Sequence, residues 1–193
     1  QLHALVNTGD DFEHLGLHIS PDIGTLLYTL SGLANPEAGW GVAGETWQAM
    51  AALERLGGET WFRLGDRDLA THLWRTQQLA AGVSLLELTA TLAAQLGVQT
   101  HVHPMCEEPV RTMVRCQDLS MAFQHYFVRE RCEPEVTGFG FEGISAAHPN
   151  RNVIRLLQER AFSSLVVCPS NPYVSIDPIL QIPGLWLALR DNP

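Results

Sequence analysis

The strongest candidate for chemistry is the polar stretch at residues 7–11, NTGDD, which follows a short apolar run at residues 3–6. The run has the form of a strand, and open α/β sheets bind ligands at the carboxyl ends of their strands. The adjacent carboxylates of Asp10 and Asp11 can hold Mg²⁺ through one or two oxygens, which leaves its other positions to water and substrate phosphate. The alternative is that both residues only cap a turn, in which Asp is common.

A second candidate is the junction at residues 64–72, which is dense in Asp, Arg and His. A helix N-terminus attracts anions, and Arg67 is placed there to grip a phosphate or a carboxylate. The alternative is structural: Asp66 caps the helix that carries His72, Asp68 adds a favourable first-turn charge, and Arg67 is solvated.

The third candidate is the loop at residues 169–178, PSNPYVSIDP, which follows an apolar run at residues 165–168 that we expect to be a buried strand. Its prolines fix the backbone, while Ser170, Asn171 and Ser175 offer hydrogen bonds suited to a base edge, a ribose or a phosphate. A proline-rich connection without function is the alternative. Small polar groups at the end of a strand favour the ligand site.

A fourth stretch, FQHYFVRER at residues 123–131, alternates in a way that predicts an aromatic strand. Such a strand, with Arg129 at its end, could line the site of a flat heterocycle. The favoured interpretation is that the aromatic side chains belong to the core and that Arg129 and Arg131 are solvated or paired.

The elements that must position these stretches alternate along the chain. A capping box, Ser84 with Glu87, and an N-cap followed by Pro21 mark two helix starts. The patterns predict helices at residues 20–33, 45–56, 66–77, 84–97, 150–160 and 185–190, and strands at residues 3–6, 60–64, 99–105, 110–117, 121–129 and 165–168. This order predicts an α/β fold with a mostly parallel sheet flanked by helices, and a smaller α+β insertion at about residues 84–145.

Composition narrows the classes of function. The chain has 193 residues, 46% of them hydrophobic, so it fits a single domain with a sizeable core. Its formal charge of −9 argues against binding a nucleic-acid duplex. All 12 basic residues are Arg, which excludes lysine Schiff-base chemistry and a lysine-dependent phosphate loop.

The cysteines and the lengths of the apolar runs indicate in which cellular compartment the protein is expected. The four cysteines are widely spread without a C-x-x-C pair, as expected for reduced thiols in the cytoplasm. No apolar run reaches the roughly 18 residues that span a bilayer. The chain starts without Met in what resembles a strand already under way, so we expect an N-terminal piece to be missing.

Several of these motifs occur together in one known family. The segments NTGDD, HLGLHISPD, GWGVAGETW, LGDRDLATHLWRTQ, FQHYFVRERCEP and CPSNPYVSIDPIL resemble, in this order, the 2-phospho-L-lactate transferase (CofD) family of deazaflavin coenzyme biosynthesis. The resemblance runs over nearly the whole chain and is closest to the bacterial branch, in which the transferred group is phosphoenolpyruvyl rather than phospholactyl. It implies one Rossmann-like α/β domain over residues 1–193 and assembly as a homodimer.

The resemblance also implies a reaction. A phospholactyl or phosphoenolpyruvyl group would pass from a guanosine diphosphate-linked donor to the ribityl hydroxyl of a deazaflavin, 7,8-didemethyl-8-hydroxy-5-deazariboflavin, with Mg²⁺ as cofactor and release of GMP. Asp10 and Asp11 match the metal-binding stretch, and Arg67 matches a phosphate-neutralising position. The residues that match substrate-binding positions are Asn7, Thr8 and Gly9 on the acceptor side, Ser170, Asn171 and Ser175 on the nucleotide side, and Asp66 and His72 at the helix junction.

Two departures from the family pattern bear on these expectations. The family usually has Asp before the Thr that follows SPD, whereas this chain has Gly24 before Thr25, which removes a carboxylate near the acid pair. The family also begins with a Gly-rich strand-loop-helix and ends with a further strand, and we expect this chain to lack both. A nucleotide-sugar-binding regulatory protein of the same fold, similar to the gluconeogenesis factor relatives, and an inactive variant are therefore the alternative hypotheses.

Overall fold

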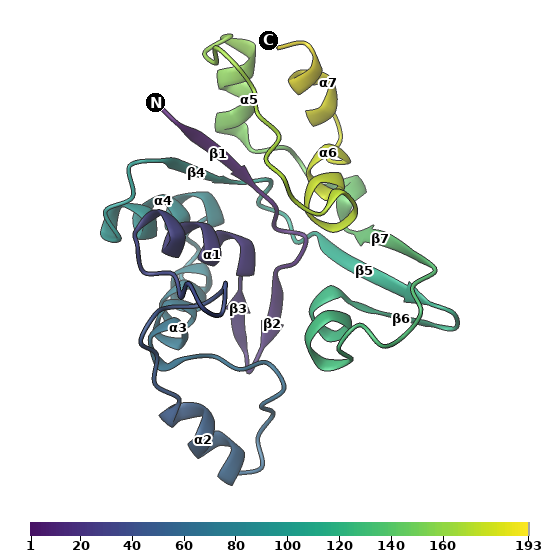
Figure 1. Cartoon of the computed structure of the whole chain (residues 1–193). Helices are drawn as coiled ribbons and strands as arrows, with labels where there is room; N and C mark the ends of the chain where they lie inside the picture. Colours follow the sequence, from purple (N-terminus) through teal and green to yellow (C-terminus); the bar gives the residue numbers. More distant parts are fainter. Residues whose placement is uncertain (193) are drawn as a thin grey trace.

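A parallel pair of strands lies at the centre of the computed structural model, which describes residues 1–192 (Figure 1). Strands β1 (His3–Val6) and β4 (His101–Pro104) pair from His3 opposite His101 to Val6 opposite Pro104. Helices α1 (Pro21–Leu30) and α4 (Leu85–Gln95) cover one face of the pair, and α5 (Arg151–Gln158) and α7 (Leu185–Arg190) lie on the other side. The predicted α/β, Rossmann-like class is therefore confirmed.

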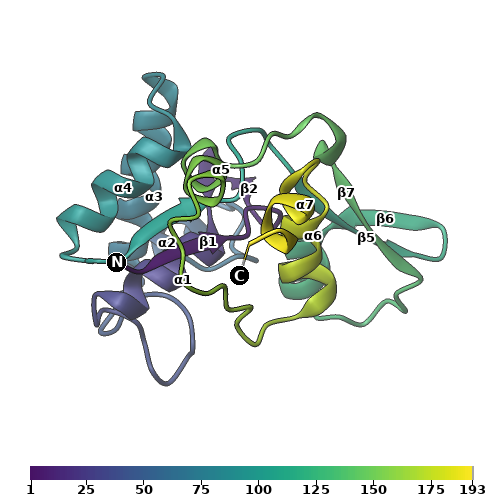
Figure 2. The same ribbon diagram turned by 90° about the horizontal axis from the view of Figure 1, so that it is seen from above.

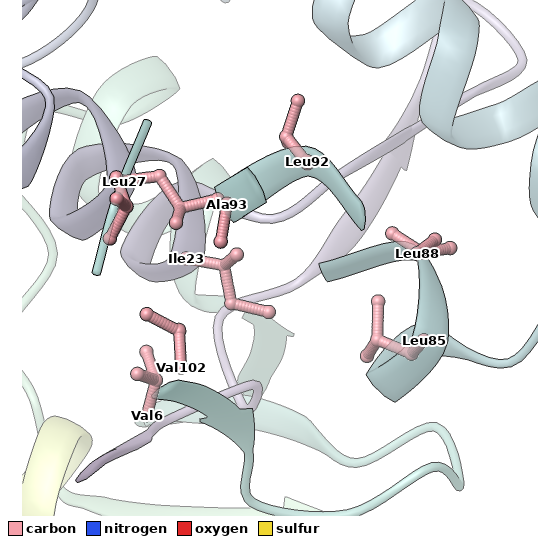
Figure 3. Packing of buried hydrophobic residues seen from close by; sticks show 9 residues of the cluster. Val6, Ile23, Leu27, Leu85, Leu88, Leu92, Ala93 and Val102 are labelled. Atoms are coloured by element: carbon pink, nitrogen blue, oxygen red, sulfur yellow. The ribbon is translucent and has the colours of Figure 1, made fainter. Parts of the chain in front are cut away.

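The two sides of the strand pair have separate hydrophobic cores. Ile23 and Leu27 of α1 pack with α4 against Val6, and neither Ile23 nor Leu27 is exposed at all (Figure 3). Complete burial of each such side chain stabilises the fold by about 1.5–3 kcal/mol. On the other side, Leu5 packs against the cluster that includes Leu157 of α5. Successive residues of β1 thus face opposite cores, as strand geometry requires.

Short antiparallel elements complete the fold. Strands β5 (Arg111–Cys116), β6 (Leu119–Ala122) and β7 (Gly138–Glu142) form a sheet in the order β6-β5-β7. This sheet lies at the end of the molecule opposite to α4 (Figure 2). Strands β2 (Phe12–His14) and β3 (Leu17–Ile19) form a hairpin next to helix α3 (Asp66–Ala80). The remaining elements are helix α2 (Gln48–Arg55), helix α6 (Asp177–Leu180), a 3₁₀ turn at Ile144–Ala146 and π-helical turns at His125–Arg129 and Pro172–Ile176. None of the helices in residues 1–192 is long and apolar enough to cross a membrane.

Three predicted strands are wrong. Residues 60–64 are irregular, because their apolar side chains pack on Phe12 without joining a ladder. The strand expected at residues 121–129 ends at Ala122, and the chain then turns into the π-helical segment. Residues 165–168 are neither a strand nor buried, since Val166 and Val167 are 80% and 72% exposed. A β-prone run becomes a strand only where a neighbouring edge accepts its hydrogen bonds.

Helices α2 and α3 cap each other. The Asp66 carboxylate accepts hydrogen bonds from the backbone N–H groups of Gln48 (3.1 Å) and Ala49 (3.0 Å) at the start of α2. In return Glu45 accepts hydrogen bonds from the N–H groups of Arg67 and Asp68 at the start of α3, both at 2.8 Å. The prediction that Asp66 caps its own helix is therefore wrong. Helix α2 also begins at Gln48 rather than at residue 45, because Glu45 serves the neighbouring helix.

The mutual capping predicts a specific loss of stability. Replacing Glu45→Ala leaves two N–H groups of α3 without an acceptor and should lower the free energy of unfolding by about 1 kcal/mol. Denaturant titration of the variant measures the change. Glu37→Ala, in the same loop but at an exposed side chain that caps no helix, is the matched control. Equal stabilities of the two variants would contradict the capping role.

Candidate active site

The acidic loop at residues 7–11 is held against strand β5 at a glycine. The Gly9 N–H donates to Asn7 Oδ1 (2.8 Å), and the Gly9 carbonyl accepts from the Thr112 N–H (2.7 Å). A Cβ atom at Gly9 would lie 2.7 Å from Thr112 Oγ1 and 2.9 Å from Asn7 Oδ1, which no real side chain tolerates. Glycine is therefore required here for close packing, and it brings the loop next to β5.

Asn7 joins three segments that are distant in sequence. Its Nδ2 donates to Asp22 Oδ2 (2.9 Å) in the first turn of α1 and to the Val174 carbonyl (3.2 Å) in the Pro172–Ile176 turn. The first and third predicted stretches therefore meet in the folded chain. Asn171 shapes the start of the Pro172–Ile176 turn, because its Oδ1 accepts hydrogen bonds from the N–H groups of Tyr173 (2.9 Å) and Val174 (3.4 Å).

Asp10 and Asp11 are buried, with 6% and 2% exposure, and only partly satisfied. Asp11 Oδ2 accepts hydrogen bonds from Ser20 Oγ (2.8 Å) and from His18 Nε2 (3.1 Å). Ser20 precedes α1, but its hydroxyl binds Asp11 instead of capping the helix. Within residues 1–192, the Oδ1 atoms of Asp10 and Asp11 are buried without any hydrogen-bond partner. Since buried polar atoms are normally paired, these two oxygens are available to a cation or a polar substrate group.

Burial and nearby negative charge raise the pKa values of two members of the acid cluster, which consists of Asp10, Asp11 and Asp22; the two are Asp10 and Asp22. Desolvation is the main cause that raises the pKa of Asp10 to about 8, and the negative charges of Asp22 and Asp11 add to it. The polar side chains of Thr112 and Asn7 act in the opposite direction and lower this pKa. Burial also raises the pKa of Asp22, with the charge of Asp11 acting in the same direction and the hydrogen bond from Asn7 opposing it. A divalent cation bound between the carboxylates would relieve this repulsion.

A buried arginine lies behind the cluster. Arg75 is 0% exposed, and its Nη1 lies 2.8 Å from His72 Nδ1, while its Nε and Nη2 have no partner. Burial lowers the pKa of Arg75, and the charges of Asp11, Tyr28 and Asp68 act in the opposite direction. The structure thus provides one internal cation near the acid cluster.

In the second predicted stretch, at residues 64–72, Asp68 and His72 are buried, whereas Asp66 and Arg67 lie nearer the surface. His72 is 3% exposed, and its Nε2 lies 3.2 Å from Asp68 Oδ1, which also accepts from Tyr28 Oη (2.7 Å). Asp66 is engaged in capping α2, and Arg67 donates from Nη1 to the Ala43 carbonyl (3.1 Å). Among residues 1–192, no hydrogen bond joins Asp66 or Arg67 to the acid cluster.

The remaining predicted residues lie at the surface or away from the cluster. Ser170 is exposed and Ser175 is half-buried, both in the segment that Asn7 binds through Val174. In the fourth stretch, Phe123 stacks on Phe127, and residues His125–Arg129 form a π-helical turn instead of the predicted strand. Over residues 1–192, no three His, Cys, Asp or Glu side chains converge closely enough to hold a metal by themselves. A metal at Asp10 and Asp11 would need substrate or water oxygens.

Sequence reasoning missed several contributors to the site, namely His18, Ser20, Arg75 and Thr112, and it assigned Asp22 only to the helix. One signal was present for Arg75. Asp68, His72 and Arg75 are spaced i, i+4 and i+7, which puts them on one face of α3. The other contacts depend on how the hairpin and β5 fold back onto the loop, which no local pattern records.

The raised pKa of Asp10 predicts a pH-dependent stability. Between its unfolded value near 4 and about 8, the folded state holds the Asp10 proton more tightly than the unfolded state, so stability from this group falls as pH rises. Asp10→Asn removes this loss and should raise the free energy of unfolding at pH 8 by roughly 2–4 kcal/mol, with little effect near pH 4. Denaturant titrations of both proteins from pH 4 to pH 8 measure the difference. A difference that does not change with pH would contradict the assignment.

Comparisons with known proteins agree with this architecture. The chain is 39% identical over 198 residues to the phosphoenolpyruvate transferase of Mycobacterium tuberculosis, covering 99% of this chain and 59% of that protein. The phosphoenolpyruvate transferase of Kitasatospora aureofaciens is 38% identical over 198 residues, covering 100% of this chain and 61% of that protein. The chain therefore spans less than two thirds of the length of these relatives.

The structural and family comparisons complete this evidence. A crystal structure of a UPF0052 family protein from Bacillus halodurans superposes with a TM-score of 0.62 at 14% identity, covering 98% of this chain and 57% of that one. At this identity the likeness shows the fold alone. The family described as 2-phospho-L-lactate transferase CofD matches residues 1–193. The chain therefore belongs to the 2-phospho-L-lactate transferase CofD family.

Proposed function

We propose that the protein transfers a phosphoenolpyruvyl or phospholactyl group from a guanosine diphosphate-linked donor to the ribityl hydroxyl of a deazaflavin, with release of GMP. Membership of the family and the names of the similar relatives support a transferase of this class. The phosphoenolpyruvyl donor is favoured because the relatives reported above are phosphoenolpyruvate transferases.

The observation that carries the proposal is the buried acid pair with two unpartnered oxygens. Asp10 and Asp11 would hold Mg²⁺ through their Oδ1 atoms, which are the donors that a hard cation prefers. When bound, Mg²⁺ neutralises charge on the transferring phosphate and aligns it with the attacking hydroxyl. Ser20 and His18 fix the Asp11 carboxylate, so its free oxygen has a defined direction.

The other residues of the chain have roles that follow from their positions. In the metal-free chain Asp10 binds a proton near neutral pH, and Mg²⁺ binding would displace that proton and leave Asp10 as a carboxylate ligand. Asn7 keeps the nucleotide-side segment, with Ser170, Asn171 and Ser175, beside the acid pair through its bond to Val174. Arg67 forms no ion pair within residues 1–192, so its guanidinium remains suited to a substrate phosphate.

The direct test supplies all reactants. The full chain is incubated with deazaflavin, Mg²⁺ and each guanylated three-carbon acid in turn, and GMP is quantified by chromatography. We expect GMP release with the phosphoenolpyruvyl donor and loss of release when the metal is chelated. No GMP with either donor at saturating Mg²⁺ would overturn the proposal.

Removing one carboxylate should impair the reaction more than it impairs folding. Asp11→Asn keeps the volume but loses the charge of a proposed ligand, so kcat/KM should fall by more than about 10²-fold, the upper range for a residue that only supports a ligand. Asp118→Asn, at an exposed turn between β5 and β6, is the control and should leave kcat/KM unchanged. Equal activity of the two variants would exclude Asp11 from the reaction.

A carboxylate at position 24 should strengthen metal binding. Residue 24 lies one helical turn after Ser20, whose hydroxyl binds Asp11, and helical side chains lean toward the helix N-terminus. The nearest atom to a Cβ at Gly24 is Tyr28 Cε2 at 3.8 Å, so a side chain can begin there without a clash. Gly24→Asp should lower the Kd for Mg²⁺ about tenfold in calorimetric titration, whereas Gly24→Ala should not change it. Equal values for both variants would show that position 24 does not reach the metal.

A further inference from the structure

A stacked pair of aromatic rings, of which one is exposed and the other half-buried, has no role in the chemistry proposed so far. Tyr173, in the Pro172–Ile176 turn, stacks on Phe139 of β7, with ring centroids 6.0 Å apart and an angle of 19° between the planes. Tyr173 is 64% exposed, so one face of its ring is open to solvent. We call this pair the aromatic platform.

Strand register places Phe139 on the side of the sheet that meets the acidic loop. In the β5–β7 pairing, Phe139 lies opposite Val114 and Phe141 lies opposite Thr112. Directly opposite residues project from the same face, and so do residues two apart on one strand, so Phe139 shares a face with Thr112. Thr112 bonds the loop through the Gly9 carbonyl (2.7 Å), and its side chain is one of the groups that act on the pKa of Asp10.

Backbone contacts tie the turn that carries Tyr173 to the same loop. The carbonyl of its neighbour Val174 accepts a hydrogen bond from Asn7 Nδ2 (3.2 Å), and the Tyr173 N–H donates to Asn171 Oδ1 (2.9 Å). Tyr173 is therefore carried by a turn that the acidic loop binds, and Phe139 is carried by the strand that pairs with β5, which this loop also binds. Such a ring keeps its position without a ligand and loses little conformational entropy when one arrives.

The chemistry of the platform selects a flat, unsaturated ring. An exposed tyrosine face binds heteroaromatic rings by stacking, which tolerates different ring systems because each has a π face. The exposed Asn171 beside Tyr173 adds a polar side chain at the rim of this surface. An extended aliphatic ligand would gain none of the stacking.

We propose that the aromatic platform stacks the flat heterocycle of one of the two substrates, the guanine base of the donor or the deazaflavin ring of the acceptor. The inference rests on the proposed function for the identity of the heterocycle and adds a binding subsite to it. Phe139 supports Tyr173 from behind, and Tyr173 contacts the ligand.

Binding measurements on the full chain, without turnover, test the subsite. The Kd for deazaflavin is measured by its own fluorescence and the Kd for GDP by calorimetry in the presence of Mg²⁺. Tyr173→Ala should weaken one of these two affinities about tenfold, and the affected ligand identifies the stacked ring. Tyr173→Phe, which keeps the ring, should bind within about twofold of the original chain.

Phe127→Ala supplies a matched control. Phe127 is also exposed, at 55%, and stacks on Phe123 with ring centroids 5.4 Å apart, but in the part of the chain that the structure describes no hydrogen bond joins its turn to the acidic loop. Its removal should change neither Kd. Unchanged affinities for both ligands in Tyr173→Ala overturn the platform, and so does an original chain that binds neither compound. Binding that depends on Tyr173 but is never followed by GMP release keeps the platform and overturns the transferase reaction instead.

Discussion

The burial of two adjacent carboxylates is the constraint around which this structure is organised. Removing a carboxylate from water costs several kcal/mol unless hydrogen bonds or opposite charges replace the water. Here Ser20 and His18 satisfy only one oxygen of Asp11, and Arg75 supplies a positive charge from behind the hairpin. The compensation is incomplete, because one oxygen of each carboxylate has no partner. Such an uncompensated cost is typical of functional sites and supports the proposal that the acid pair binds a cation.

The same constraint explains why distant segments converge on the short loop after β1. Asn7 fixes the first turn of α1 and the Pro172–Ile176 turn with a single amide group. Gly9 lets the Thr112 side chain of β5 come close to the loop, because a Cβ atom at position 9 would force this side chain to shift. The acid pair is therefore held by a helix, a hairpin and a strand at once, which limits its motion to that of the packed core. This rigidity is what positioning of a phosphate and a hydroxyl demands.

Local signals in the sequence predicted much of this arrangement, and tertiary contacts decided the rest. The strand at residues 3–6, the helix after Ser20 and the capping box at Ser84 follow from short-range patterns, and each is present. The apolar run at residues 165–168 carries the pattern of a strand, but no strand edge pairs with it in the folded chain. Asp66 has the sequence context of a cap for α3 and instead caps α2, because the chain brings a second helix start within reach. His18 and Thr112 have no local signature at all, since their contacts arise only when the hairpin and β5 close on the loop.

The negative charge of the acid cluster opposes the binding of a phosphate substrate at this site. The charges of Asp22 and Asp11 raise the pKa of Asp10, the charge of Asp11 also raises the pKa of Asp22, and the chain has no lysine to offset these carboxylates. Arg75 is fully buried, so it balances the carboxylates without contacting a ligand. A diphosphate approaching this cluster would meet net repulsion unless a cation came with it, because like charges a few ångströms apart repel each other strongly in a partly buried site. The proposed Mg²⁺ satisfies both sides of that conflict: it binds the unpartnered carboxylate oxygens and presents positive charge to the phosphate, which none of the neighbouring side chains can do alone.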